Sequence, residues 1–179
     1  MENRLPQRKP MRLKGYDYSQ AGYYFLTICI KDRQKLLGQI VGDAALGVPR
    51  MELSSADKMV EGYINNINRQ SGVRLDKYVI MPNHIHLLLC VRASTDHGTP
   101  RAAPPTKASV PRVVNALKGL TSKKFGETLW QRTYYDHIIR DEADYQCKWQ
   151  YIDENIFRWK DDEYCRPQDA EGGVPYDGE

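Results

Sequence analysis

The stretch that decides the fold is residues 75–91, LDKYVIM-PN-HIHLLLCV. The two runs 75–81 and 84–91 are rich in apolar and β-branched residues, a composition typical of buried strands. A Pro-Asn pair at 82–83 separates them, and such a pair interrupts a strand and favours a tight turn. The sequence therefore predicts a β-hairpin whose second strand begins at His84.

Further elements precede this hairpin. Residues 23–30, YYFLTICI, form another compact apolar run and predict a buried strand. A serine pair at 54–55 can cap a helix that continues through Met59, Tyr63 and Ile67 at helical spacing. A strand and a helix are therefore expected before the hairpin.

The second half of the chain predicts two helices and one more strand. A helix is expected over 110–125, followed by a strand with irregular ends over 129–140 and a last helix over 142–159. The first of these helices places Val113, Leu117 and Leu120 on one face; the last has an apolar stripe of Tyr145, Trp149, Ile152, Ile156 and Trp159. The order of elements predicts an α+β fold, a ferredoxin-like split βαβ sandwich with an antiparallel sheet and an extra C-terminal helix.

Length and composition place these elements in one domain. The chain has 179 residues, 41% hydrophobic and 27% charged, and a chain of this length can bury a core without disulfides. We expect a basic N-terminal arm over 1–20, a folded domain over 21–160 and an acidic tail over 161–179. A flexible loop rich in Pro, Thr and Ala is expected at 92–108.

Charge is unevenly distributed along the chain. Residues 160–179 carry a net charge of −5, so residues 1–159 carry +8 of the total of +3. A basic body favours a polyanionic partner such as nucleic acid, although ordinary cytosolic proteins are often mildly basic too. No apolar run approaches the roughly 20 residues of a membrane span, and no apolar stretch follows the basic N-terminus. The four cysteines form no CxxC pair, which indicates a reducing, cytoplasmic setting without a structural zinc site.

His84 and His86 are the most distinctive pair for chemistry. Residues two apart on a strand point to the same face, so the two imidazoles stand side by side as nitrogen ligands for a divalent metal. The alternative is one surface histidine and one core histidine that are two residues apart by chance.

The last expected helix can supply the other groups. Asp144, Lys148, Tyr151 and Asn155 form a polar stripe beside the apolar one. If this stripe faces the histidines, Asn155 offers a metal an oxygen ligand and Tyr151 presents a phenol that can attack a phosphodiester. Tyr151 could instead be a half-buried structural residue. Three other tyrosines are rivals for the same role: Tyr134, Tyr135 and Tyr145.

Several blocks together resemble a known family. Residues 81–89, MPNHIHLLL, resemble the His-hydrophobic-His (HUH) signature of single-tyrosine transposases of the insertion-sequence type. Four further blocks resemble the branch called REP-associated tyrosine transposases: RLKGYDY (12–18), WQR (130–132), YDHIIR (135–140) and YIDEN (151–155). The resemblance covers roughly residues 8–160.

This resemblance implies a metal–tyrosine site in a ferredoxin-like fold. It makes His84 and His86 ligands of a Mg²⁺ or Mn²⁺ ion, Asn155 the third ligand, and Tyr151 the nucleophile that becomes joined to a DNA 5′-phosphate. Relatives usually have Asn-Pro where this chain has Asn155-Ile156, so the end of the helix and the role of Asn155 depart from the family pattern.

Basic residues outside this site suggest where DNA would bind. There is no acidic residue between Asp96 and Glu127, and a run of this kind is either a solvated helix face or a surface that contacts the DNA backbone. We expect DNA contacts from Arg8, Lys9, Arg12, Lys14, Arg112, Lys118, Lys123, Lys124, Arg132 and Arg140. His137 and its neighbour Asp136 face opposite ways on a strand, so a structural or DNA-contact role for His137 is favoured over a catalytic pair.

The sequence thus predicts a metal-dependent enzyme that nicks single-stranded or hairpin DNA and transfers the strand through a 5′-phosphotyrosine. One alternative is a catalytically silent hairpin-binding module derived from a transposase. Another is a metal-dependent phosphoesterase that uses water. The chain is expected to act as a monomer or a homodimer.

Overall fold

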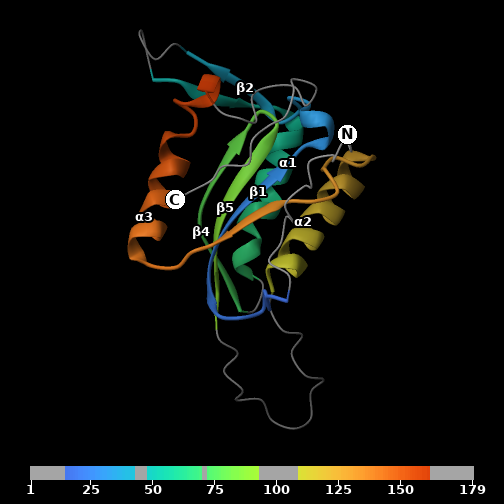
Figure 1. Cartoon of the computed structure of the whole chain (residues 1–179). Helices are drawn as coiled ribbons and strands as arrows, with labels where there is room; N and C mark the ends of the chain where they lie inside the picture. The colour runs from blue at the N-terminus through green and yellow to red at the C-terminus, as the bar shows by residue number, and fades with distance from the viewer. Residues whose placement is uncertain (1–14, 43–47, 70–71, 93–108, 162–179) are drawn as a thin grey trace, which may run out of the picture.

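A four-stranded antiparallel sheet forms the centre of the molecule, with helices on both faces (Figure 1). The computed structural model describes residues 15–42, 48–69, 72–92 and 109–161. The strands follow the order β4-β5-β1-β6, with the bounds β1 Gly22–Cys29, β4 Val73–Met81, β5 His84–Val91 and β6 Tyr135–Ile138. Helices α1 (Ser55–Asn65) and α2 (Val110–Phe125) cover one face and α3 (Glu142–Glu154) lies on the other. This is the ferredoxin-like arrangement with an added helix, as the sequence predicts.

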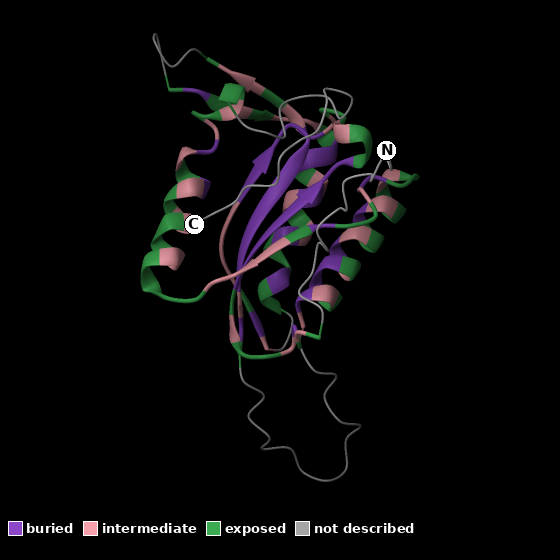
Figure 2. Cartoon of the chain, viewed as in Figure 1, coloured by how far each residue is buried: buried purple, intermediate pink, exposed green. Residues whose placement is uncertain are grey.

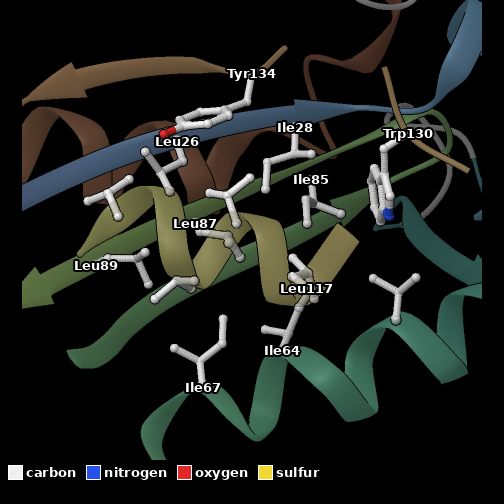
Figure 3. Close-up of a cluster of buried hydrophobic side chains, with 14 of the residues drawn as sticks. Leu26, Ile28, Ile64, Ile67, Ile85, Leu87, Leu89, Leu117, Trp130 and Tyr134 are labelled. Atoms are coloured by element: carbon white, nitrogen blue, oxygen red, sulfur yellow. The ribbon is translucent and has the colours of Figure 1, made fainter. Parts of the chain in front are cut away.

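Side chains alternate between the two faces along β1 and β5. Leu26 and Ile28 of β1 point to the face covered by α1 and α2, together with Ile85, Leu87 and Leu89 of β5 (Figure 3). The alternate residues of both strands, which include His84 and His86, point to the α3 face, because successive residues of a strand point to opposite sides. Neighbouring residues of β5 therefore pack in different layers, one toward α1 and α2 and the next toward α3.

The layer between the sheet and the α1/α2 pair is the main core. α1 contributes Val60 and Ile64, and Ile67 follows just beyond its end; all three are buried against the leucines of β5. The Ser54 hydroxyl accepts a hydrogen bond from the Asp57 amide at 3.1 Å, which confirms the expected N-cap.

The apolar face of α2 differs in one residue from the prediction. Val113 and Leu117 are buried as expected, but the side chain of Leu120 is 49% exposed. Val114 and Thr121 take its place against the core, because the buried face follows steps of three and four from Val110. Gly126 ends the helix with φ +95°, in the left-handed region that favours glycine.

A short hairpin that the sequence analysis missed connects β1 to α1. It consists of β2 (Gly38–Val41) and β3 (Arg50–Leu53). Gly38 has φ +142°, and a Cβ there would collide with the carbonyl oxygen of Glu52, so the pairing requires glycine at this position.

Two boundaries in the C-terminal half also differ from the prediction. The strand expected over 129–140 shrinks to β6, preceded by a single bridge between Ile30 and Trp130. The helix expected over 142–159 ends at Glu154, and a short 3-10 turn follows at Trp159–Asp161. The apolar stripe is nevertheless confirmed: all its residues pack in one cluster with Phe25, Val79, Met81 and Leu88 of the sheet.

One lysine of β4 contacts α3 in two ways. The Lys77 ammonium lies 2.6 Å from the Asp153 carboxylate and 4.1 Å from the ring centroid of Trp149. Both partners belong to α3, so this lysine of β4 holds the helix by an ion pair and a cation–π contact together.

Some predictions fall outside the described residues. These are most of the N-terminal arm, the loop at 93–108 and the tail from residue 162 onward. Tyr18, near the end of the arm, is buried in the main core. Cys29, Cys90 and Cys147 are free thiols. None of the helices in the described part of the chain is both long and apolar enough to cross a membrane.

Candidate active site

The centre of the candidate site is the pair of histidines at the start of β5. The Nε2 atoms of His84 and His86 face each other at 3.0 Å, and the ring centroids are 4.6 Å apart. Both side chains are buried, with exposed fractions of 0% and 1%. The strand geometry thus brings the two imidazoles together as the sequence analysis expects.

The outer nitrogen of each imidazole has its own partner. His84 Nδ1 lies 2.8 Å from Asn83 Oδ1, and His86 Nδ1 lies 2.9 Å from the hydroxyl of Thr27 on β1. An amide oxygen only accepts, so His84 donates from Nδ1 and directs the lone pair of Nε2 toward its neighbour. Partners of this kind, which fix the ring and its tautomer, are typical of metal-binding histidines.

Both histidines are held in the neutral form. Burial lowers the pKa of His86 to about 3, with a smaller contribution from the Lys148 ammonium, while a hydrogen bond to the Leu26 backbone acts in the opposite direction. Burial likewise places the pKa of His84 well below its ordinary value, and the neighbouring His86 and Arg33 act in the same direction. Neutral imidazole is the form that coordinates a metal.

The separation of the two Nε2 atoms is compatible with bonds from both to one divalent cation. Two bonds of about 2.1 Å at a right angle place their nitrogens about 3.0 Å apart, which is the separation of the Nε2 atoms here. The described residues include no cluster of three or more His, Cys, Asp and Glu side chains that could hold a metal. A further protein ligand would therefore have to be a group such as the amide of Asn155.

Tyr151, in the polar stripe of α3, faces the histidines. The ring centroid of Tyr151 lies 5.3 Å from that of His86, at an interplanar angle of 74°. Phe25 of β1 contacts both rings: it stacks on His86 at 5.0 Å and meets Tyr151 edge-to-face at 5.7 Å. Asn155 is buried one turn beyond Tyr151, at the C-cap of α3. The structure thus places Tyr151 beside the histidine pair and Asn155 on the same helix.

The three rival tyrosines lie elsewhere. Tyr134 is buried in the main core, on the far side of the sheet from the histidines. Tyr145 donates a hydrogen bond from its hydroxyl to Asp76 at 3.0 Å, and burial together with this bond raises its pKa to about 12. Tyr135 lies on β6 opposite Thr27 and is exposed. Of the four tyrosines considered, Tyr151 has the ring contact with His86.

A cationic and an aromatic side chain complete the surroundings. The Lys148 ammonium, one turn before Tyr151, lies 5.7 Å from the ring centroid of Phe25. Trp159 follows α3, and its ring lies 6.1 Å from that of His84. The histidine pair is thus covered by Tyr151 and Trp159 and has a positive charge nearby.

The segment beside Asn83 has an unusual backbone. Asp32 and Arg33 both have positive φ, +55° and +51°, and the Asn83 side-chain amide donates to the Arg33 carbonyl at 3.3 Å. A non-glycine residue in this region costs on the order of 1–3 kcal/mol. The contacts around the Asn83 turn therefore hold a strained segment next to the histidines.

The expected DNA-contact residues are divided between the two faces. Arg112, Lys123 and Lys124 are exposed on α2, so they lie across the sheet from the histidines. Lys118 of the same helix donates to the carbonyls of Gln131 and Thr133 at 2.9 and 2.8 Å, and these bonds hold the segment before β6. Arg132 and Arg140 are exposed at either end of β6. Arg8, Lys9, Arg12 and Lys14 lie outside the described residues.

His137 has the structural role that was favoured for it. Its Nε2 lies 2.8 Å from Asp144 of α3, and the Arg140 amide donates to the same carboxylate at 3.1 Å. The His137 contact lowers the pKa of Asp144, against the effect of burial. Asp136, the neighbour of His137, is paired with Leu26 and so points to the other face of the sheet.

Sequence reasoning missed the residues that support the histidines. Thr27 is the one polar residue in the apolar run 23–30, and a lone hydroxyl in a buried strand is a signal that could have identified it. Asn83 was noted only as a turn residue. Phe25 and Trp159 had no distinguishing signal, because aromatic residues in apolar stripes are ordinary core residues.

Comparison with known proteins gives a consistent result. Residues 18–155 match the family model described as "Transposase IS200 like". An uncharacterized protein of Haemophilus influenzae is 34% identical over 174 residues, which is 89% of this chain and 93% of that protein. The ISDra2 transposase TnpA of Deinococcus radiodurans is 30% identical over 122 residues, 68% of this chain and 75% of its own length.

Two further matches concern the REP-associated branch. A Haemophilus influenzae protein named as a REP-associated tyrosine transposase is 24% identical over 138 residues, 72% of this chain and 66% of its own length. The structure of a REP-associated tyrosine transposase bound to a REP hairpin superposes with a TM-score of 0.58 at 19% identity. The superposition covers 83% of this chain and 74% of that one, and it supports the fold. The resemblance inferred from the sequence blocks is confirmed.

Proposed function

The chain belongs to the IS200-like transposase family, and from this premise we propose that it nicks single-stranded DNA and transfers the cut strand through a covalent bond to Tyr151. Transposases are enzymes, so the family supplies the general activity. The mechanism and the role of each residue are our proposal.

The observation that carries the proposal is the contact between Tyr151 and the histidine pair. The Tyr151 ring lies against His86, and His86 faces His84 at 3.0 Å on the same side of the sheet. A phenol beside two converging imidazoles combines a nucleophile with a site that can neutralise a phosphate. Among the described residues, the buried cluster on the other face of the sheet contains tyrosines, such as Tyr24 and Tyr134, but no histidine, and most of its members are leucine, isoleucine and valine.

In this proposal His84 and His86 hold a Mg²⁺ or Mn²⁺ ion, with Asn155 as a third ligand. When bound, such an ion would polarise the phosphoryl oxygens and stabilise the charge that develops on them. Thr27 and Asn83 keep the imidazoles oriented for this purpose, as their hydrogen bonds to the two Nδ1 atoms indicate.

The covalent step exchanges one phosphoester bond for another. The Tyr151 oxygen attacks the phosphorus and loses its proton, while the bond from phosphorus to the 3′ oxygen breaks and that oxygen takes up a proton. The products are a free 3′-OH and a 5′-phosphotyrosine. A second 3′-OH then attacks the phosphotyrosine, a new phosphodiester forms, and Tyr151 regains its proton. Because the phosphotyrosine conserves the bond energy, no ATP is needed.

The covered state of the histidines implies that part of the site moves. Tyr151 and Trp159 lie over the pair, so a phosphate reaches it when the C-terminal elements shift. α3 is suited to such a shift, since Ile152 is the one residue of this helix that is fully buried.

A hairpin is the proposed form of the DNA substrate. The solved relative of the REP-associated branch is bound to a REP hairpin, and the family match makes a similar substrate the first to test. The expected contacts come from the cations that the sequence analysis identified near β6, Arg132 and Arg140.

The decisive experiment is incubation of the full chain with single-stranded and hairpin oligonucleotides and Mn²⁺. A covalent protein–DNA adduct should appear on a denaturing gel and map to Tyr151 by peptide mass spectrometry. The Tyr151→Phe variant keeps the ring that packs on Phe25 and His86, so it should bind DNA and form no adduct. An adduct at another tyrosine would refute the assignment of the nucleophile.

The same experiment tests the two alternatives. Tight hairpin binding without an adduct in the unaltered chain would indicate a catalytically silent binding module. Cleavage that persists in Tyr151→Phe, without any adduct, would indicate a phosphoesterase that uses water.

A further inference from the structure

The α3 face of the sheet is covered unevenly. α3 packs mainly against β4 and β5, and β6, at the edge of the sheet, is exposed or only partly buried along its length (Figure 2). β1 and β6 carry two exposed aromatic side chains, Tyr23 at 37% and Tyr135 at 39%. On the described part of the sheet these are the large exposed apolar side chains. An aromatic ring left open to solvent in this way offers a surface for a flat ligand.

Strand register places these rings on the same face as the histidines. Tyr135 is paired with Thr27, whose hydroxyl contacts His86, and His137 is paired with Phe25. Directly paired residues of antiparallel strands point to the same side. Tyr23, Phe25, Tyr135 and His137 therefore lie in one row on this face, here called the aromatic strip. Phe25, in the middle of the row, is buried against Tyr151, so the exposed rings are those of Tyr23 and Tyr135, on either side of the Tyr151 site.

A hollow lies at one end of the aromatic strip. Its volume is about 360 Å³, within the usual range of small-molecule pockets. Its lining combines aromatic, cationic and anionic side chains: Tyr23, Ile139, Arg140, Asp141, Glu142 and Tyr145. Aromatic rings with hydrogen-bonding groups beside them are the combination that binds an unpaired nucleobase.

We propose that the aromatic strip binds the unpaired bases on either side of the phosphate attacked by Tyr151, and that the hollow holds one of these bases. This inference rests on the proposed function and adds to it the path of the DNA strand. The occupant is single-stranded DNA because the two exposed rings flank the reaction centre: Phe25, buried between them in the strip, contacts both Tyr151 and His86.

Distances along the elements agree with this path. Tyr145, at the hollow, precedes Tyr151 by six residues, which is about 9 Å along a helix. Thr27 follows Tyr23 by four residues, so Tyr135, opposite Thr27, lies about 13 Å further along the strand direction than Tyr23. The two exposed rings are thus separated by a distance that a few nucleotides can span, with the reacting groups between them.

The charges beside the strip fit a DNA strand at two points. Arg140 lines the hollow, and the Lys148 ammonium lies over Phe25. The acidic neighbours have other contacts: Asp144 with His137, and Asp141 with the amide of Asp144 at 2.9 Å, as the N-cap of α3. Stacking supplies the main interaction in this arrangement, and the two cations supply contacts to the backbone.

The test measures binding of a fluorescent oligothymidine to the Tyr151→Phe chain by anisotropy. Tyr135→Ala should weaken binding by about 5- to 100-fold, the usual effect of removing one stacking ring. Tyr135→Trp, which keeps a ring, should restore it. The matched control is Leu120→Ala, which removes an exposed apolar side chain from α2 on the opposite face and should leave the affinity unchanged. Unchanged affinity in Tyr135→Ala would overturn the proposal.

Photo-crosslinking locates the strand directly. An oligothymidine containing 5-iodouracil, irradiated with the full chain, should form crosslinks at Tyr23, Tyr135 or Tyr145, identified by peptide mass spectrometry. Crosslinks confined to α2 would place the strand on the opposite face and refute the proposal. Crosslinks that are lost when the chain self-associates would show instead that a second copy covers the strip.

The failure of the inference and of the proposed function can be told apart. If an adduct forms at Tyr151 and Tyr135→Ala binds DNA normally, DNA binding by the strip is refuted and the proposed reaction stands. If Tyr135→Ala loses binding and the unaltered chain forms no adduct, the proposed reaction is refuted and the strip remains a DNA-binding surface.

Discussion

The two faces of the sheet differ in what they bury. On the face covered by α1 and α2, the strands present leucine and isoleucine to two helices, and the layer closes into a continuous core. On the α3 face, the same strands present Thr27, His84 and His86 to a helix that buries only Ile152. One face forms the main core and the other carries the proposed reaction centre, and the alternation of side chains along a β-strand separates the two.

The difference shows how a small domain can hold buried polar groups. Five of the seven buried polar or charged residues of the described chain belong to the site: Thr27, Asn83, His84, His86 and Asn155. Desolvating such groups costs free energy, and the apolar layer on the opposite face offsets this cost. Substitutions of neighbouring residues on β5 should therefore affect reaction and stability separately.

Among substitutions on the α3 face, His86→Gln should cause the largest loss in the rate of adduct formation. Gln has similar size and can still donate to His84, so the free energy of unfolding without metal should change by no more than about 1 kcal/mol. Loss of a metal ligand should reduce formation of the Tyr151 adduct by at least about 100-fold. The measurement is the rate of adduct formation at saturating Mn²⁺, and an unchanged rate would contradict the role of His86.

Leu87→Ala, at the next residue, should lower stability and leave the rate of adduct formation unchanged. Leu87 is fully buried in the main core, so the variant should lose about 2–5 kcal/mol of unfolding free energy in urea. At a temperature where it stays folded, its rate of adduct formation should match that of the unaltered chain. A rate loss as large as that of His86→Gln would show that the two faces are not separable.

Thr27→Val should weaken metal binding with little change of shape. The substitution removes the hydroxyl 2.9 Å from His86 Nδ1, and loss of such a supporting hydrogen bond typically lowers metal affinity by about 10- to 100-fold. Isothermal titration with Mn²⁺ measures the change. Thr121→Val is the matched control, because Thr121 is buried on α2 across the sheet and bonded to Trp130; it should lower stability and leave Mn²⁺ affinity unchanged.

Asp57→Asn tests one of the two buried polar residues on the face covered by α1 and α2. Asp57 of α1 is fully buried, its carboxylate oxygens have no hydrogen-bond partner among the described residues, and burial raises its pKa to about 7, with help from Glu61. A raised pKa means that the unaltered chain loses stability as pH rises from about 4 to 7. The variant should be more stable by about 1–3 kcal/mol at pH 8 and equal at pH 4, as measured by urea unfolding. An equal difference at both pH values would contradict the titration of Asp57.

The sequence predicted most of the fold, because the alternation and spacing of apolar residues determine it locally. The β4–β5 hairpin, the start of α1 at Ser54 and the bounds of α2 were all confirmed. The β2–β3 hairpin was missed, since its strands are short and half-exposed and so lack a buried apolar run. The shortening of the last strand and helix depends on tertiary contacts, which no local pattern reports.

The candidate site also has features that could be predicted from the sequence and features that depend on tertiary packing. His84 and His86 follow from strand geometry, and Tyr151 was found through the stripe on α3 and the family blocks. That the stripe faces the histidines could not follow from the sequence alone, because it requires the packing of α3 over β4 and β5. The sequence also gave no sign that the rings of Tyr23 and Tyr135 are exposed, because their exposure depends on the position at which α3 packs on the sheet. The position of the α2 cations across the sheet is a result of topology and not of spacing.

The two-residue turn at Pro82 and Asn83 has a consequence for how this protein can evolve. It fixes the pairing of Met81 with His84, and the pairs from there to Lys77 with Leu88 follow from that start; beyond them the register shifts by one residue at Asp76. Because side chains alternate with a period of two, one inserted residue in β5 would carry the histidines into the leucine layer and the leucines into the site. Most single substitutions in the hairpin change one contact, whereas the insertion or deletion of one residue exchanges the side chains on the two faces of the strand. Between the turn and the register shift at Asp76, the hairpin should therefore tolerate new side chains at many positions and almost no insertion or deletion.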